Sequence, residues 1–416
     1  LGVVLATPAQ TELPDFGDSS QSVLSQANEE RLGEAFFRKL RRQVTIVDDP
    51  EVESYIQNIG YRLASHIKQN EVRFTFFVVD DPSVNAFAGP GGFIGINSGL
   101  ITTTQSESEL AAVLAHEIAH VTQRHISRTV ELREQTSAAL LAGLAAAILL
   151  GTQHSEAGAA SAAVLQSRAA QSFLDFSRAN ELEADRISIE LMAAAGLDPR
   201  AVPQFFERLQ EMSRYSTQSP EFLSTHPVTT ARIAESRARA DIYPFRQHTS
   251  SIGFYLIRSK LQVSAHKSAR EAVIKFEKKL ASGKYISELG ANYGLTLALL
   301  NSGNLDRAAI VIEKLIAKHP ERISFYDTSA KIETKRGNLE KALLIYEDNL
   351  ELYPDSKVLV RGYIEVLILN NRPQTAISQL EQYSKHHSLD GQMYQLAARA
   401  HKETGNARGA HAALAE

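Results

Sequence analysis

The chain has 416 residues, of which 44% are hydrophobic and 22% are charged, and its formal net charge at pH 7 is -4. This composition is typical of a globular protein with more than one domain, and it excludes a disordered chain and a strongly basic nucleic-acid-binding protein. The chain has no cysteine, so any metal ion must be held by histidine, aspartate or glutamate.

Residues 1–26 form a polar leader after a short apolar start. The opening "LGVVLATPAQ" passes from apolar through small to polar residues, as at the end of a secretory signal that is cleaved after Ala6 or Ala9. We therefore expect an exported protein, and a frayed terminus is the alternative. No stretch reaches the ~20 apolar residues of a membrane span.

The next hundred residues predict a small sheet covered by helices. Residues 27–45 and 50–68 carry apolar side chains at helical spacing, whereas residues 72–81 alternate and are rich in β-branched and aromatic types, as in a strand. Residues 84–101 predict two short strands around a Gly-Pro-Gly-Gly turn. This turn lacks the Lys-Ser/Thr of a phosphate-binding loop, so a nucleotide site is not favoured.

A single long helix is expected over residues 107–135, because Ser106 and Glu109 form a capping box at its start. The stretch "AHEIAH" at 115–120 lies inside this helix. His116 and His120 project from one face and can bind the same ion, whereas Glu117 is turned by about 100° and can contact the ion's water. A carboxylate there can accept a proton from that water, which indicates a hydrolytic zinc site with one Zn²⁺ per chain.

The third ligand must come from elsewhere in the chain. His125 would lie about 140° around the helix from His120, so we expect it to stay outside the site, behind a ligand or on the surface. A later helix over 172–196 carries Glu181 and Asp185 four residues apart. One of them can bind the ion while the other orients a ligand histidine, and we expect Glu181 to be the ligand.

Two further segments have more than one interpretation. The apolar residues 138–171 are either a lid or membrane-surface contact near the cleft, or a plain helical hairpin. His226 precedes Pro227, which restricts it to extended geometry. Either His226 closes the open position of the zinc ion as a latch, or it is a helix-capping or surface histidine.

Beyond residue 250 the sequence repeats every 34 residues. Glycines at 303 and 337, alanines at 308 and 342 and prolines at 320 and 354 mark the period, which continues to Gly405. This period is typical of tetratricopeptide repeats, in which paired helices stack into a solenoid. We therefore predict a mostly α domain with a small β-sheet (α+β) over 27–248, followed by an all-α tetratricopeptide domain over 249–416.

The motifs "HEIAH" and "NELEAD", with "NAFAGPGGFIGINSGLI" before them and "STHP" after, resemble the gluzincin metallopeptidases related to the CAAX prenyl protease and the heat-shock membrane protease. The resemblance implies a zincin-type fold with ligands His116, His120 and Glu181, catalytic base Glu117, and Asp185 behind a ligand. It also implies that the edge of a strand pairs with an extended substrate. The residues expected at this edge are Gly92, Phe93, Ile94, Gly95 and Ile96.

The repeat tail and the exported start extend the resemblance to periplasmic members of this family. It implies an endopeptidase that acts on unfolded or misassembled outer-membrane proteins, with repeats that recruit these clients or the outer-membrane assembly machinery. We expect no nucleic-acid partner and at most peripheral membrane contact. The rival is a chaperone-like scaffold with a structural or latent zinc site. Glu117 favours the enzyme, because a structural site has no use for an unligated carboxylate.

Overall fold

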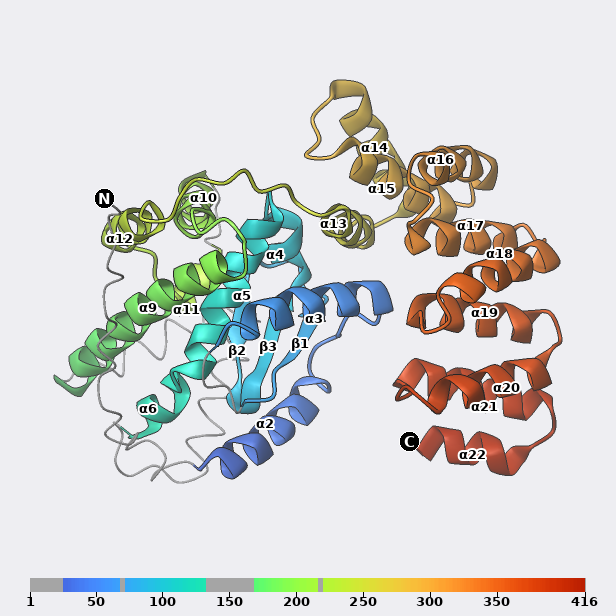
Figure 1. Cartoon of the computed structure of the whole chain (residues 1–416), viewed down its shortest axis with the longest axis horizontal. Helices are drawn as coiled ribbons and strands as arrows, with labels where there is room; N and C mark the ends of the chain where they lie inside the picture. Colours follow the sequence, from blue (N-terminus) through green and yellow to red (C-terminus); the bar gives the residue numbers. More distant parts are fainter. Residues whose placement is uncertain (1–24, 68–71, 132–167, 216–219, 416) are drawn as a thin grey trace, which may run out of the picture.

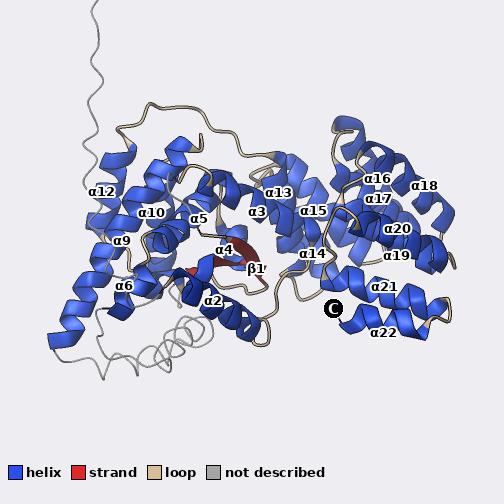
Figure 2. Ribbon diagram, turned by 60° about the horizontal axis from the view of Figure 1, so that its bottom comes forward, coloured by secondary structure: helices blue, strands red, loops and turns tan. Residues whose placement is uncertain are grey.

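The computed structural model describes residues 25–67, 72–131, 168–215 and 220–415 (Figure 1). Helices dominate these residues, and a small sheet lies inside the first half of the chain (Figure 2). This arrangement confirms the predicted fold class. The suggested cleavage sites and nearly all of 138–171 lie outside the described residues. Among the described helices, none is both long and apolar enough to cross a membrane.

The sheet has three strands, β1 (Thr75–Val79), β2 (Ala86–Ala88) and β3 (Phe93–Asn97), in the order β1-β3-β2. Alternate side chains point to opposite faces, and each face is covered by helices. Phe76, Val78 and Ile96 pack in a core with α3 (Pro50–Ala64) and α5 (Glu107–Thr122). Phe77 and Phe87 pack on the other side against α2 (Gln26–Leu40).

The predicted substrate edge at Gly92–Ile96 is wrong. Strand β3 lies in the centre of the sheet, with β1 parallel on one side and β2 antiparallel on the other. Gly92 precedes β3 in a short 3-10 turn, η1 (Pro90–Gly92). The backbone groups of β3 are therefore shared between two neighbours, and the strand on the outside next to α5 is β2.

Helix α5 is shorter than the predicted helix, because it ends at Thr122 and α6 (His125–Glu131) starts after a break. Arg124 adopts a φ of 52° at this break, a left-handed conformation that non-glycine residues seldom adopt. The remaining helices of this half are α4 (Ser98–Thr103), α9 (Arg168–Ala194), α10 (Ala201–Tyr215), α11 (Phe222–Thr225) and α12 (Thr230–Ala240).

The second half stacks as a column of antiparallel helices beside the sheet-containing half (Figure 1). The left-handed positions Gly303, Gly337, Asn371 and Gly405 recur every 34 residues, each just after the first helix of a pair. The pairs are α15 (Glu288–Asn301) with α16 (Leu305–Lys318), α17 (Ile323–Lys335) with α18 (Leu339–Leu352), α19 (Lys357–Leu369) with α20 (Pro373–Ser384), and α21 (Gly391–Glu403) with α22 (Ala407–Ala415).

Helices α13 (Ile252–Ser264) and α14 (Ala269–Ser282) precede these pairs, and α13 joins the two halves. Phe254 and Ile257 belong to the same core as the sheet, whereas Leu256 and Val263 pack among the first repeat helices. The start of α3 adds charged contacts between the halves, with Lys260 Nζ 2.7 Å from Asp49 Oδ2.

Candidate metal centre

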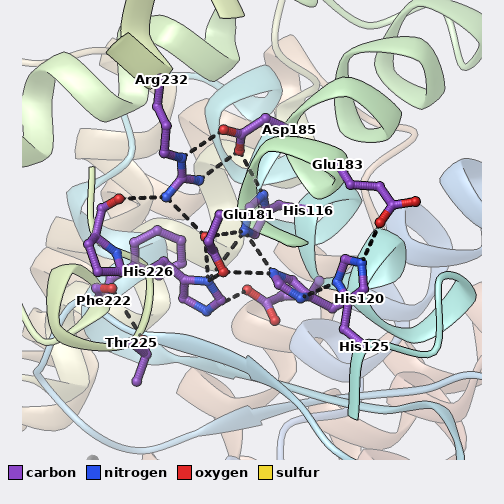
Figure 3. A network of polar contacts seen from close by, with 12 residues as sticks. His116, His120, His125, Glu181, Glu183, Asp185, Phe222, Thr225, His226 and Arg232 are labelled. Atoms are coloured by element: carbon purple, nitrogen blue, oxygen red, sulfur yellow. Dashed lines mark hydrogen bonds and ion pairs between the residues drawn. The ribbon is translucent and has the colours of Figure 1, made fainter. Parts of the chain in front are cut away.

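Four side chains converge between α5, α9 and the end of α11 (Figure 3). His116 and His120 come from α5, Glu181 comes from α9, and His226 follows α11. One nitrogen or oxygen atom of each lies within 4.8 Å of the others. His116, Glu181 and His226 are only 2%, 5% and 8% exposed. Buried polar groups of this kind need partners.

Five of the six pairs among these donor residues have atoms at the spacing expected around a tetrahedral ion. His116 Nε2 lies 3.1 Å from His120 Nε2, 3.3 Å from Glu181 Oε2 and 3.3 Å from His226 Nδ1. Glu181 Oε1 lies 3.0 Å from His226 Nδ1 and 3.3 Å from His120 Nε2. Ligands bound at zinc distances in a tetrahedron stand about 3.3 Å apart. Imidazole nitrogens with one carboxylate oxygen are also a donor set that zinc prefers, so these residues fit a zinc ion.

Burial and the carboxylates set the protonation of this group. Burial lowers the pKa of His120 to about 3, against the attraction of Glu181, so this imidazole keeps a free lone pair. Burial also acts to lower the pKa of His116, but hydrogen bonds with Asp185 and Glu181 outweigh it and raise the pKa to about 10. Burial acts to raise the pKa of Glu181, yet the nearby histidines hold it well below its ordinary value. A bound cation would displace the proton from His116.

A buried ion pair lies behind the first histidine. Asp185 Oδ1 is 3.1 Å from His116 Nδ1, which leaves His116 Nε2 facing the other donors. Arg232 donates to both oxygens of Asp185, from Nε at 2.8 Å and from Nη2 at 2.7 Å, and its Nη1 lies 3.0 Å from Glu181 Oε2. Asp185 therefore orients one candidate ligand, while Arg232 holds both carboxylates of α9 in place.

Glu117 lies beside the four donors and is 1% exposed. Its Oε1 has no hydrogen-bond partner among the described residues, although His226 Nε2 is 3.5 Å away. Burial raises the pKa of Glu117, against nearby histidines and a backbone hydrogen bond from Ala88. A buried carboxylate with a free oxygen at this place can accept a proton from a water molecule held by the group.

His226 is not a surface residue. Its ring stacks on Phe222, with the ring centroids 4.6 Å apart and the planes at 26°. Its backbone N–H donates to the carbonyl of Phe222 at 2.7 Å, which ends α11. The same residue thus caps a short helix and points its imidazole into the donor group.

Two side chains lie next to the donor group: His125 is behind a candidate ligand, one of the two places expected for it, whereas the role of Arg232 was missed from the sequence. His125 contacts His120, because the break at Arg124 changes its direction, and it also contacts Glu183 (Figure 3). Arg232 is buried on a helix whose other arginines, 237 and 239, lie toward solvent. The residues around Arg232 in the sequence do not distinguish it from Arg237 and Arg239.

The sequence of this chain is similar to those of known metallopeptidases. Residues 50–240 match the model of peptidase family M48. The Escherichia coli beta-barrel assembly-enhancing protease is 31% identical over 404 residues, which cover 97% of this chain and 83% of that protein. A Vibrio cholerae homologue of that protease is 34% identical over 399 residues, which cover 95% of this chain and 82% of its own length.

A more distant relative matches less than half of the chain. The mitochondrial metalloendopeptidase OMA1 of Schizosaccharomyces pombe is 32% identical over 179 residues, which cover 43% of this chain and 50% of that protein. The donor group and Glu117 lie within the matched family range. The chain therefore belongs to the beta-barrel assembly-enhancing proteases of the M48 metallopeptidase family.

Proposed function

We propose that this chain is a zinc-dependent endopeptidase of the periplasm that acts in outer-membrane protein assembly and quality control. The observation that carries the catalytic part is the buried convergence of His116, His120 and Glu181 beside the free oxygen of Glu117. One zinc ion per chain would be held by the two histidines and Glu181. Bound there, zinc supplies Lewis-acid activation of water and of the scissile carbonyl.

The protein's own groups then handle the proton. Glu117 would accept a proton from the attacking water and deliver it to the leaving amine, and its raised pKa suits both steps. Asp185 keeps the ring of His116 in one orientation, and Arg232 keeps Asp185 ionised inside the protein. None of these roles requires the repeats.

Strand β2 is the better candidate for the substrate edge. The Gly89 amide and the Asn85 carbonyl bond to β3, so by the antiparallel alternation the backbone groups of Ala86 and Ala88 face away from the sheet. The hydrogen bond between the Ala88 backbone and Glu117 places this edge next to the catalytic base. The amides of Ala86 and Ala88 already donate to Asn85 Oδ1 and to Glu117, so an extended peptide added there would pair with the carbonyls of this edge and pass close to the four donors.

We also propose that His226 acts as a latch. Its Nδ1 lies at hydrogen-bond distance from His116 Nε2 and from both oxygens of Glu181, where it would be a fourth ligand to a bound zinc ion. A latched site excludes the water that Glu117 needs. Moving the loop that follows α11 would free that vertex.

The central experiment compares the wild-type chain with Glu117→Gln for cleavage of an unfolded protein, with bound zinc measured in both. Gln keeps the shape of Glu but cannot accept the proton. Equal zinc content with cleavage lost only in the variant is expected. Cleavage that survives in Glu117→Gln would refute the role of Glu117.

His226→Ala tests the latch and the scaffold alternative. We expect faster cleavage with zinc retained by the other three ligands. Unchanged or slower cleavage at full zinc content would refute the latch. If neither wild type nor His226→Ala cuts any substrate, the chaperone-like scaffold with a structural zinc ion becomes the better account.

The names of the relatives support the proposed substrates and the proposed periplasmic location. The relatives are named as enhancers of beta-barrel assembly, and stacked helix pairs offer a surface for other proteins. We expect cleavage of unfolded outer-membrane proteins in preference to unfolded soluble proteins of equal length. We also expect the full chain to appear in the periplasmic fraction after osmotic shock, and a cytoplasmic location would refute the assignment.

A further inference from the structure

His125 lies behind the metal centre and outside the group of four donors. It is 4% exposed, and its Nδ1 lies 2.8 Å from Nδ1 of His120. On its other side, His125 Nε2 lies 3.1 Å from Glu183 Oε2. Arg128 Nη1 donates to the same oxygen at 2.8 Å. Figure 3 shows the resulting chain from His120 through His125 to Glu183.

The direction of these hydrogen bonds follows from the role of His120 as a metal ligand. Two ring nitrogens at 2.8 Å require one donor and one acceptor. The Nε2 of His120 faces Glu181 and His116, so its lone pair must stay free for a cation. The proton of His120 is then on Nδ1, and His125 accepts it. His125 in turn carries its proton on Nε2, where the Glu183 carboxylate accepts it.

The backbone is bent to make this contact. A continuous helix would turn residue 125 about 140° away from residue 120. Arg124 instead takes the left-handed conformation, so that α6 starts at His125 with its ring against His120. Glu29 of α2 holds the bend, with its Oε2 3.5 Å from Arg124 Nη2 and 3.2 Å from the hydroxyl of Ser127. Unusual backbone conformations of this kind are retained where neighbouring contacts fix them.

We propose that His125 and Glu183 are positioning residues that fix the tautomer and the ring orientation of His120. The inference rests on the proposed function, in which His120 binds zinc. Each ligand histidine then has its own partner behind it, which is the Asp185 carboxylate 3.1 Å from Nδ1 of His116 and the neutral ring of His125 2.8 Å from Nδ1 of His120. A neutral acceptor orients His120 without placing a fourth carboxylate directly against the buried group that already contains Glu117, Glu181 and Asp185.

A matched pair of substitutions separates hydrogen bonding from packing. In His125→Asn the side-chain oxygen falls near the place of Nδ1 and can still accept from His120, whereas His125→Leu has nearly the same shape and no acceptor. The zinc dissociation constant of the full chain is measured by competition with a chelator, and the unfolding temperature of the metal-free protein is measured alongside. We expect His125→Leu to bind zinc roughly 10–100-fold more weakly than the wild type. We expect His125→Asn to stay close to the wild type.

The zinc affinity of Glu183→Ala is expected to lie between those of His125→Leu and His125→Asn, because this variant keeps His125 but removes the acceptor for its Nε2 proton. Equal weakening in the Asn and Leu variants would show that an acceptor at the place of Nδ1 does not preserve zinc affinity, and it would overturn the inference, as would unchanged affinity in both. Wild-type protein that binds no zinc would instead overturn the proposed function and this inference together. The two failures are therefore distinguishable.

Discussion

The buried arginine behind the metal centre gives the largest stability effect that we expect from one substitution. Arg232 is 4% exposed and pairs with Asp185, which is 3% exposed, and with Glu181, which is 5% exposed. Replacing it with leucine leaves two buried carboxylates on α9 without their arginine partner. Breaking a buried ion pair from one side costs about 3–5 kcal/mol of unfolding free energy.

Arg237→Leu is a matched control, because Arg237 lies on the same helix and takes the same substitution. Its side chain is 59% exposed, and its ion pair with Glu207 is on the surface. Pairs of this kind contribute about 0–1 kcal/mol. We therefore expect Arg232→Leu to lower the unfolding free energy by about 2–5 kcal/mol more than Arg237→Leu does, which is the difference between those two ranges.

The assay is urea unfolding of the metal-free full chain, followed by circular dichroism. Bound zinc supplies positive charge next to Glu181, so the difference between the two variants is expected to shrink when zinc is restored. Equal destabilisation by the two substitutions in metal-free protein would refute the account of Arg232 as the counterion of α9.

Two further predictions concern the junction and the repeats. Burial acts to raise the pKa of Asp49, but Lys260 outweighs it and the pKa is lowered, so the stability that Asp49 contributes is present above pH 3.8 and lost as pH falls through its folded pKa. Asp49→Asn keeps the helix cap, and unfolding midpoints between pH 7 and pH 2 should then fall less steeply below about pH 4 than in the wild type. A Cβ at Gly362 would lie 2.3 Å from the hydroxyl of Tyr346, whereas a Cβ at Gly391 meets nothing within 4 Å. Gly362→Ala should therefore lower the unfolding free energy by roughly 1–3 kcal/mol. Gly391→Ala should leave it unchanged or raise it, and equal effects in thermal melts would contradict this packing argument.

Features that depend on local sequence were predictable. The 34-residue period fixed the helix pairs, because each repeat uses the same turn, even where Asn371 replaces glycine in the left-handed conformation. The start of α5 was also predictable, since the hydroxyl of Ser106 accepts from the amide of Glu109 as the capping box requires. The grouping of His116 with His120 follows from the helical period alone.

Features that depend on distant contacts were not predictable. Strand β3 is central because β1, which is earlier in the chain, pairs with it in parallel, and no local pattern encodes that strand order. The break before His125 depends on Glu29, almost a hundred residues away, and arginine is not a residue that marks a turn. The burial of Arg232 likewise depends on carboxylates of another helix.

Because α13 contributes to two hydrophobic cores, the two halves of the chain depend on each other for stability. Phe254, Ile257 and Leu261 are covered by one half of the chain, and Leu256 and Val263 by the other. A cut at residue 248 would remove α13 from the first half and expose part of its hydrophobic core. The separated repeats would expose the apolar side chains of α13 that this core had covered. Heating should accordingly melt both halves in a single cooperative transition, and each fragment expressed alone should tend to aggregate.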